Sequence, residues 1–349
     1  MRITACIILC LSTVVSAQIL PSSQRIDWAP GIPGGIPSPA VLVNVADYGA
    51  TADGSADDHG AFTAAIEALP SEGGAVLVPE GTYLIGATVT LPSGAVLRGE
   101  GADKTRLHFS QNDDTPCIEA ITYQRGEWVD ALSGYTHGST ELVVADGSSF
   151  EAGGFAEIQQ DNDPEIMYTE SKWDQSWAEH SVGQMLVIDG VNKNTLTLAT
   201  PLHSTYRSER NPVVRSQGLV EKAGVERLFV KKTVPDADGS TFHFKNAAYC
   251  WVGEVESDHT RKSHVSVSWS IGCVFRDSYF HHSYDHGGDG HGYGVNLGRH
   301  VTACLVENNI FRHLRHSMLV QVGATGNVFG YNYSRENVQG EGETDMNQG

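Results

Sequence analysis

Two hydrophobic periodicities follow one another in the first third of the chain. Phe62, Ile66 and Leu69 recur at helical spacing and predict one short amphipathic helix over about 58–69, with Asp57 as its N-cap. The pattern then changes to alternation of apolar and polar residues, which is typical of strands that bury one face. Short strands separated by Gly and Pro turns are predicted at 75–78, 82–85, 89–91 and 96–97.

A repeat is visible in the second half of the chain. Its copies begin at Cys250, Cys273, Cys304 and Asn327, at spacings of 23, 31 and 23 residues. Repeats of this size form stacked coils, because one coil can bury its apolar face only against its neighbours. The aligned copies predict two inward columns, made by Val265, Val295 and Val320 and by Val267, Leu297 and Val322.

Two further columns follow from the same alignment. Cys250, Cys273 and Cys304 fall at equivalent positions, where neighbouring strands about 4.8 Å apart would allow a disulfide. We favour a buried ladder of free thiols, because unpaired cysteine packs as a small hydrophobic residue. Asn309 and Asn332 also align and predict an amide ladder at a turn.

A segment with a different sequence pattern separates the two strand-rich regions. Residues 125–212 contain alternating strands and the tight turns Asp146-Gly147 and Asp189-Gly190, which predict a small antiparallel β subdomain inserted between coils. We therefore expect a cap and first coils over 18–124, the insert over 125–212 and further coils over 213–349. The last residues, 335–349, are almost free of apolar side chains and provide no cap, so we expect the chain to be truncated.

Three sequence blocks near the N-terminus carry a family resemblance. They are DYGATADGSADD at 47–58, GGAVLVPEGTY at 73–83 and LPSGAVLRGEG at 91–101. This arrangement resembles the start of the pectate-lyase-like β-helix proteins, the group that includes rhamnogalacturonases and epimerase-like relatives. The resemblance implies an all-β fold, a right-handed single-stranded parallel β-helix (solenoid) with an N-terminal capping helix. Because many carbohydrate chemistries share this fold, the resemblance implies no particular reaction.

The ends and the charge of the chain narrow the function classes. Residues 1–17 combine Arg2, a short apolar run and Val15-Ser16-Ala17, which predicts a signal peptide and a secreted or periplasmic protein. No other apolar stretch approaches membrane length. The net charge of −19 excludes a nucleic-acid partner, and we expect a monomer. Residues 207–349 hold 15 basic and 16 acidic side chains, against 8 and 26 before them, so a polyanionic ligand is expected on the second half.

The segment HHSYDHGGDGHGYG, 281–294, is the densest concentration of candidate chemistry. The long spacing between Cys273 and Cys304 places eight extra residues here, so we predict a loop at 281–290 and a strand over about 292–297. The alignment of Val295 with Val320 puts His291 opposite His316, with Arg261 in the same column of the preceding coil. Together these groups predict a cationic track beside the loop.

Imidazoles, phenols and cations at this position favour β-elimination on a uronate polysaccharide, which needs a base, an acid and a cation beside the carboxylate. The predicted catalytic residues are His291, Tyr293, His316 and Arg315. The predicted substrate-binding residues are Arg261, Lys262, Asp285, His286, Asp289, Asn296 and Gln321.

Three alternatives stay open at this stage. A glycoside hydrolase would use two carboxylates, for which Asp285 and Asp289 are the candidates. A non-catalytic glycan-binding or adhesin-type β-helix would need no catalytic group. A metal is the third: the His-rich loop lacks a recognised ligand spacing, so we assign no metal ligands and no certain cofactor, although carboxylates could hold Ca²⁺.

Overall fold

The computed structural model describes residues 29–167, 175–288 and 290–338. The predicted signal peptide 1–17, Asp289 and most of the segment 335–349 lie outside this range. Within it, no helix is both long and apolar enough to cross a membrane.

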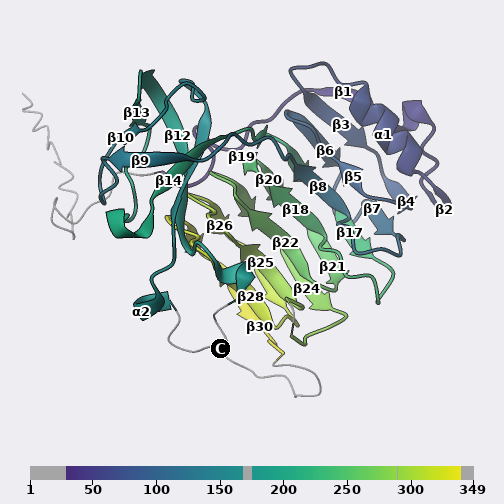
Figure 1. Ribbon diagram of the computed structural model, residues 1–349. Coiled ribbons are helices and arrows are strands. Elements are labelled where there is room, and N and C mark those ends of the chain that lie inside the picture. Colours follow the sequence, from purple (N-terminus) through teal and green to yellow (C-terminus); the bar gives the residue numbers. More distant parts are fainter. Residues whose placement is uncertain (1–28, 168–174, 289, 339–349) are drawn as a thin grey trace, which may run out of the picture.

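Three parallel sheets wind through the coils and form a parallel β-helix, which confirms the fold class (Figure 1). Sheet A is ordered β1 (Val41–Asn44), β3 (Gly74–Val78), β6 (Ala95–Gly99), β16 (Gly224–Glu226), β20 (Trp251–Gly253), β23 (Val274–Arg276), β26 (Leu305–Glu307) and β29 (Val328–Gly330). Sheet B is ordered β2 (Asp53–Asp57), β4 (Gly81–Ile85), β7 (Thr105–Phe109), β17 (Phe229–Lys232), β21 (Glu256–Thr260), β24 (Tyr279–Ser283), β27 (Ile310–Arg312) and β30 (Tyr333–Arg335). Sheet C is ordered β28 (His316–Val320), β25 (Tyr293–Leu297), β22 (Ser263–Ser268), β18 (Phe242–Lys245), β8 (Ile118–Ile121) and β5 (Val89–Thr90). A short pair, β15 (Val220–Glu221) and β19 (Ala247–Ala248), completes the solenoid.

The register of sheet C confirms part of the predicted alignment and corrects the rest. Val265 pairs with Val295 and Val267 pairs with Leu297, as the repeat predicts. The next coil is shifted, because Val295 pairs with Met318 and Val320 pairs with Leu297. The predicted column of Val265, Val295 and Val320 is therefore wrong in its last member, and so is that of Val267, Leu297 and Val322. Val320 has the same phase as Met318, so alternation of apolar residues fits either register and cannot choose between them.

The predicted columns of cysteines and of asparagines are present. Cys250, Cys273 and Cys304 are buried free thiols, and the backbone N–H of Cys273 lies 3.3 Å from the sulfur of Cys304. Asn309 and Asn332 form the predicted amide ladder, with Asn309 Nδ2 donating to Asn332 Oδ1 at 3.0 Å. These columns satisfy buried polar groups coil by coil, so they belong to the architecture of the solenoid.

Bends of the coils fall at residues in the left-handed backbone region. His259, His282 and His313 have φ values of 55°, 59° and 51° and follow equivalent positions of β21, β24 and β27. A second column of such residues precedes sheet B and contains Glu254, Asp277 and others. In the coils of β21, β24 and β27 one left-handed residue thus recurs at this bend, and it stacks the three histidines above one another.

The N-terminal end of the solenoid is covered by helix α1 (His59–Glu67), which buries Phe62 and Ile66. Its N-cap is Asp58, so the prediction of Asp57 is wrong by one residue. Asp58 accepts hydrogen bonds from the backbone N–H and the hydroxyl of Thr51 at 2.7 and 3.1 Å. Asp57 instead accepts the N–H of His59 at 3.0 Å, so the two aspartates share the helix start.

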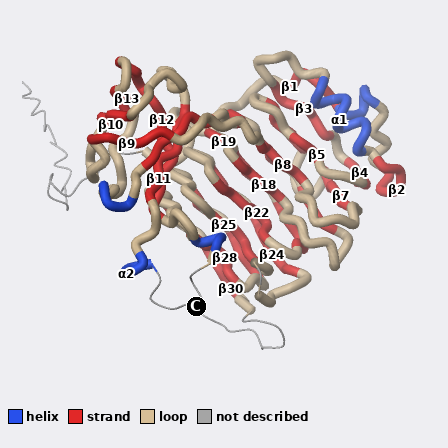
Figure 2. The backbone as a smooth tube through the Cα atoms, viewed as in Figure 1, coloured by secondary structure: helices blue, strands red, loops and turns tan. Residues whose placement is uncertain are grey.

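The inserted segment is a closed antiparallel barrel that leaves the solenoid after β8 and returns before β15. Its strands are β9 (Val129–Ser133), β10 (Glu141–Val144), β11 (Phe155–Gln160), β12 (Val182–Asn192), β13 (Thr195–Leu198) and β14 (Val213–Gln217). A one-turn helix, α2 (Pro164–Met167), extends from it. Figure 2 shows the barrel standing beside the stacked coils.

A buried contact between His300 and Glu157 fixes the barrel to the coils. His300 Nδ1 of the solenoid lies 2.6 Å from Glu157 Oε1 of β11, and both side chains are fully buried. Arg215 and Gln217 also donate to Glu157, each at 2.6 Å. Burial alone would raise the pKa of Glu157, but hydrogen bonds from His300 and Arg215 and their charges lower it to about 2. The barrel therefore has a defined position against the ends of the sheet C strands.

Candidate functional site

The His-rich segment lies at the corner between sheets B and C. Its first residues, His281 and His282, belong to strand β24, so the prediction of a loop beginning at 281 is wrong at that end. The loop starts after Ser283, and β25 begins at Tyr293, as predicted for the following strand. The two histidines break the alternation of β24, because Phe280 and His281 are both buried and His282 has a left-handed backbone, so the sequence pattern did not show this end of the strand.

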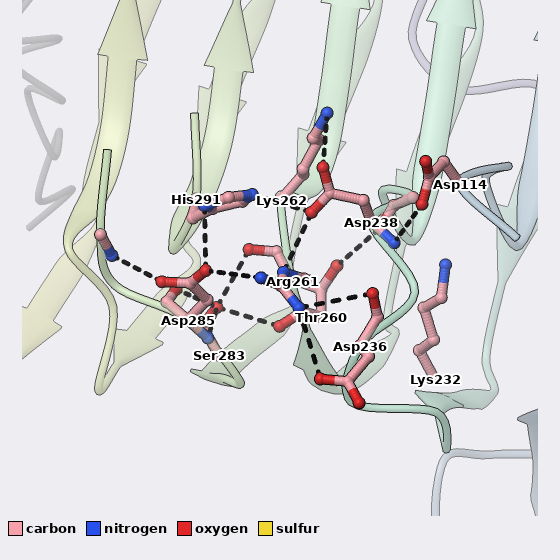
Figure 3. A network of polar contacts seen from close by, with 12 residues as sticks. Asp114, Lys232, Asp236, Asp238, Thr260, Arg261, Lys262, Ser283, Asp285 and His291 are labelled. Atoms are coloured by element: carbon pink, nitrogen blue, oxygen red, sulfur yellow. Dashed lines mark hydrogen bonds and ion pairs between the residues drawn. The ribbon is translucent and has the colours of Figure 1, made fainter. Parts of the chain in front are cut away.

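A dense network of paired charges, hereafter the Asp238–Asp285 network, occupies the loop's inner side (Figure 3). His291 lies between two carboxylates, with Nε2 at 2.8 Å from Asp238 and Nδ1 at 3.1 Å from Asp285. Arg261 contacts the same two carboxylates at 3.0 and 3.1 Å. Lys262 contacts Asp238 at 3.0 Å, so every cation of the network has a carboxylate partner.

This network corrects the prediction of a cationic track. One of the two neutralising acids, Asp285, lies in the same loop as His291, and the other, Asp238, comes from an earlier coil, because it follows β17 and precedes β18. Partial burial works against ionisation of Asp238, yet hydrogen bonds from Lys262 and His291 outweigh it and lower its pKa. The backbone N–H of Gly287 is the main cause of the lowered pKa of Asp285. Both acids are therefore stabilised as carboxylates, which does not suit a general acid for hydrolysis.

Three of the predicted catalytic residues do meet outside this network. The rings of Tyr293 and His316 lie 5.1 Å apart, because these two residues pair directly in sheet C. Arg315 adjoins them, donates to the carbonyl of Gly287 and has no carboxylate partner within the described residues. Burial and the nearby Arg315 lower the pKa of His316, which favours a neutral imidazole. His291 was predicted opposite His316 and is not; its side chain is 12% exposed within the paired network.

The remaining predicted substrate-binding residues divide between the loop and sheet C. His286 Nε2 contacts the carbonyl of His313 at 3.0 Å, so this ring fastens the loop to the next coil. Asn296 lies on β25 and Gln321 directly follows β28, and Gln321 Nε2 donates to Asn296 Oδ1 at 3.3 Å. Both are half-buried on the outer face of sheet C.

A row of polar residues crosses that outer face. Glu119, His243, Ser266 and Asn296 pair in successive registers across β8, β18, β22 and β25. Burial raises the pKa of Glu119, and burial together with Lys245 lowers the pKa of His243 to about 4. An acid and a neutral imidazole of this kind on adjacent strands are a second candidate pair for proton transfer.

At the far end of the sheet C strands lies a group of basic and aromatic side chains, hereafter the Trp269 cation surface. Arg125, Lys245 and Arg299 lie 4.7, 5.3 and 5.7 Å from the ring centre of Trp269. Lys245 also lies 4.8 Å from the ring centre of Tyr123, which is 68% exposed. Within the described residues, none of these three cations has a carboxylate within ion-pair distance. Burial lowers the pKa of each, so they are partly desolvated as well as unpaired.

The Trp269 cation surface was missed by the sequence predictions. Its members come from the start of the insert, from two strand ends and from a bend, and no local spacing connects them. The repeat alone could have indicated part of this surface. It aligns Lys245 with Ser268, and Trp269 is the residue after Ser268. Asp258 and His259 were also missed. With His282 they place ligand-type atoms within 4.8 Å of one another on sheet B, within the part of the chain that the structure describes.

The known proteins that this chain resembles are consistent with a pectate-lyase-like parallel β-helix. A family model described as rhamnogalacturonase A/epimerase, pectate lyase-like, matches residues 42–162. The resemblance drawn from the blocks at 47–101 is thereby confirmed. No curated protein sequence matches the chain significantly.

Solved structures similar to this chain are β-helix proteins of low sequence identity. The tailspike gp61 of Pseudomonas phage phi297 is 18% identical with a TM-score of 0.64, and the match covers 86% of this chain and 53% of that one. The A-module of the mannuronan C-5 epimerase AlgE6 of Azotobacter vinelandii is 15% identical with a TM-score of 0.49, covering 85% and 57%. This chain thus spans about half the length of these proteins.

Proposed function

We propose that this chain is part of a secreted enzyme that binds an acidic polysaccharide along the outer face of sheet C and cleaves it by β-elimination. The observation that carries the proposal is the Trp269 cation surface, where Arg125, Lys245 and Arg299 lie beside aromatic rings without carboxylate partners. On a chain of net charge −19, unpaired and partly desolvated cations are costly unless an anion occupies the site. Aromatic faces next to them suit the apolar faces of sugar rings.

The geometry of sheet C connects this surface with candidate chemistry. Strand β25 runs from Tyr293 to Leu297, about 13 Å at 3.3 Å per residue, and Arg299 follows two residues later. A chain of sugars on the outer face would contact Asn296 and Gln321 on the way. In this arrangement the neutral imidazole of His316 takes the C5 proton, the hydroxyl of Tyr293 donates a proton to the leaving oxygen as the C4–O bond breaks, and Arg315 stabilises the carboxylate of the reacting uronate. The family description of a rhamnogalacturonase, epimerase and pectate-lyase-like group supports a polysaccharide as the ligand class.

A spectrophotometric screen tests the reaction. Polygalacturonate and alginate are incubated with the protein, with and without a chelator, because lyase products carry an unsaturated uronate that absorbs in the ultraviolet. We expect Tyr293→Phe and His316→Ala each to lower turnover by about 10²–10⁴. His137→Ala is the matched control, since His137 is exposed on the barrel. Because the pKa of His316 is lowered from 6.5, the acid limb of the pH profile should lie below that value.

Each other outcome points to a defined alternative. If Tyr293→Phe and His316→Ala stay within a few-fold of wild type while Glu119→Gln or His243→Ala loses activity, the proton-transfer assignment moves to that pair. Saturated products that vanish with Asp285→Asn would favour the hydrolase alternative. Glycan binding without any turnover would favour the non-catalytic, adhesin-type alternative.

A further inference from the structure

A second cluster of imidazoles lies on sheet B and takes no part in the proposed reaction. Three side chains surround one oxygen of Asp258, with Nδ1 of His259, His281 and His282 at 2.6, 3.2 and 3.5 Å from Oδ1. Nδ1 of His281 and Nδ1 of His282 lie only 2.7 Å apart. Four atoms of the type that binds metals thus converge within a small volume.

The strand geometry explains the convergence. Asp258 and His281 pair in register on β21 and β24, and each is followed by a residue at a left-handed bend, His259 and His282. The rings of His259 and His282 stack at 5.1 Å, and the ring of His313 continues the stack at 4.9 Å. Because His259 and His282 belong to strands β21 and β24, the position of the imidazoles is fixed by the solenoid backbone and does not depend on a loop.

Side chains around the cluster orient its imidazoles, as outer-shell residues orient the ligands of metal sites. His281 Nε2 lies 3.2 Å from a carboxylate oxygen of Glu256, so the second nitrogen of that ring is oriented. The buried His264 contacts the carbonyl of His282 at 3.0 Å and fixes its backbone. Lys231 donates to Asp258 Oδ2 at 2.8 Å, which leaves Oδ1 for the imidazole side.

Solvent reaches the cluster. The side chains of His259 and His282 are 30% and 34% exposed, and Asp258 is 14% exposed. The ring of Tyr279 stacks on that of His281 at 4.1 Å and covers it, so the exposed side of the cluster is that of His259 and His282. Imidazole and carboxylate donors without thiolates suit divalent transition metals, whereas Ca²⁺ prefers oxygen ligands alone.

We propose that Asp258, His259 and His282 form a binding site for one divalent transition-metal ion, with His281 and Glu256 as positioning residues. The proposal is independent of the polysaccharide chemistry, because the site lies on sheet B and uses none of the residues assigned to the reaction. It also departs from the sequence analysis, which assigned no metal ligands.

Calorimetric titration of the chelator-stripped full chain with Zn²⁺ and Ni²⁺ tests the site. We expect about one equivalent bound by wild type, and at least about 100-fold weaker binding by His259→Gln and by His282→Gln. Glu256→Gln should weaken binding by about 10–100-fold, as loss of an orienting carboxylate does. Lys231→Met should strengthen it, because the competing ammonium is removed from Asp258. His137→Ala should bind as wild type.

Two further readouts separate metal binding from a merely structural cluster. Co²⁺ should produce visible absorption bands in wild type and in His137→Ala but not in His259→Gln/His282→Gln, while an excess of Ca²⁺ should not displace it. Thermal unfolding without metal establishes that each variant is folded. Wild-type protein that binds no stoichiometric Zn²⁺ or Ni²⁺, or a folded double variant that binds as tightly as wild type, would overturn the proposal.

Discussion

Two groups of basic side chains lie at opposite ends of the sheet C strands, and they differ in what surrounds them. In the Asp238–Asp285 network, Arg261 contacts two carboxylates at 3.0 and 3.1 Å, and Lys262 contacts one of them. In the Trp269 cation surface, Lys245 and Arg299 face aromatic rings and have no carboxylate partner within the described residues. The first group holds a loop in place, whereas the second is available to a ligand. The same residue types thus have different roles, which are decided by the partners that the fold provides.

The largest loss of stability is expected at the contact that fixes the barrel to the coils. This contact also bears on the Trp269 cation surface, because Arg125 of that surface lies at the start of the insert. Glu157→Gln leaves Arg215 and His300 without their shared carboxylate in a buried position. We expect a loss of about 3–5 kcal/mol in the free energy of unfolding, as for other broken buried ion pairs. Chemical denaturation measures it, and a loss below about 1 kcal/mol would contradict the role of this ion pair.

The same contact of Glu157 makes the stability of the fold depend on pH. The pKa of Glu157 is lowered from 4.5 to about 2 in the folded protein, so its contribution is complete above pH 4.5 and is lost as the pH falls towards 2. Between these values we expect roughly 3 kcal/mol of stability to disappear in wild type. Denaturation at several pH values should show a flatter acid dependence in Glu157→Gln, and equal slopes would argue against the assignment.

The next effect concerns the ligand. Lys245→Gln/Arg299→Gln removes two unpaired cations, and we expect at least a tenfold loss of affinity for an acidic oligosaccharide, about 1.4 kcal/mol. The melting temperature should change little, because neither side chain forms an ion pair within the described residues. Calorimetry at two salt concentrations is the measurement, and added salt should weaken only the wild type appreciably. Unchanged affinity in this variant would remove the main support for an acidic ligand.

The smallest effect should come from the paired network. Arg261→Met takes the shared cation from Asp238 and Asp285, and we expect a loss of about 0.5–1 kcal/mol in stability because the network is partly exposed to solvent. Affinity for the acidic oligosaccharide should stay within about twofold of wild type. A large loss of affinity with unchanged stability would show that the two groups have the opposite roles.

The sequence predicted the fold well because its signals are local or periodic. Alternation of apolar residues fixed the strands, and the repeat from Cys250 correctly aligned Val265 with Val295. The same alternation could not distinguish Met318 from Val320 as the partner of Val295, and this slip placed His316 opposite the wrong residue. Register within a coil of variable length is decided by packing between coils, which a single sequence does not display.

The candidate site was harder to predict, because it depends on groups that are distant in the chain. Asp238 contacts Arg261, Lys262 and His291 from a separate loop, and no residue pattern near the His-rich segment indicates these contacts. Arg125 and Arg299 are brought together only because the barrel returns to the solenoid beside sheet C. Tyr293 and Arg315 were named from composition and their neighbourhood was confirmed in part, since Tyr293 does pack against His316.

The central claim is that an acidic polysaccharide lies on the outer face of sheet C with its carboxylates at unpaired cations. A crystal structure of the His316→Ala variant with a bound oligogalacturonate or oligoalginate tests this most directly. The account predicts carboxylates beside Lys245 and Arg299 at one end and beside Arg315 at the other, with the Asp238–Asp285 network intact. An oligosaccharide bound on sheet A or sheet B, or one that displaces Asp238 or Asp285 from Arg261, would contradict it.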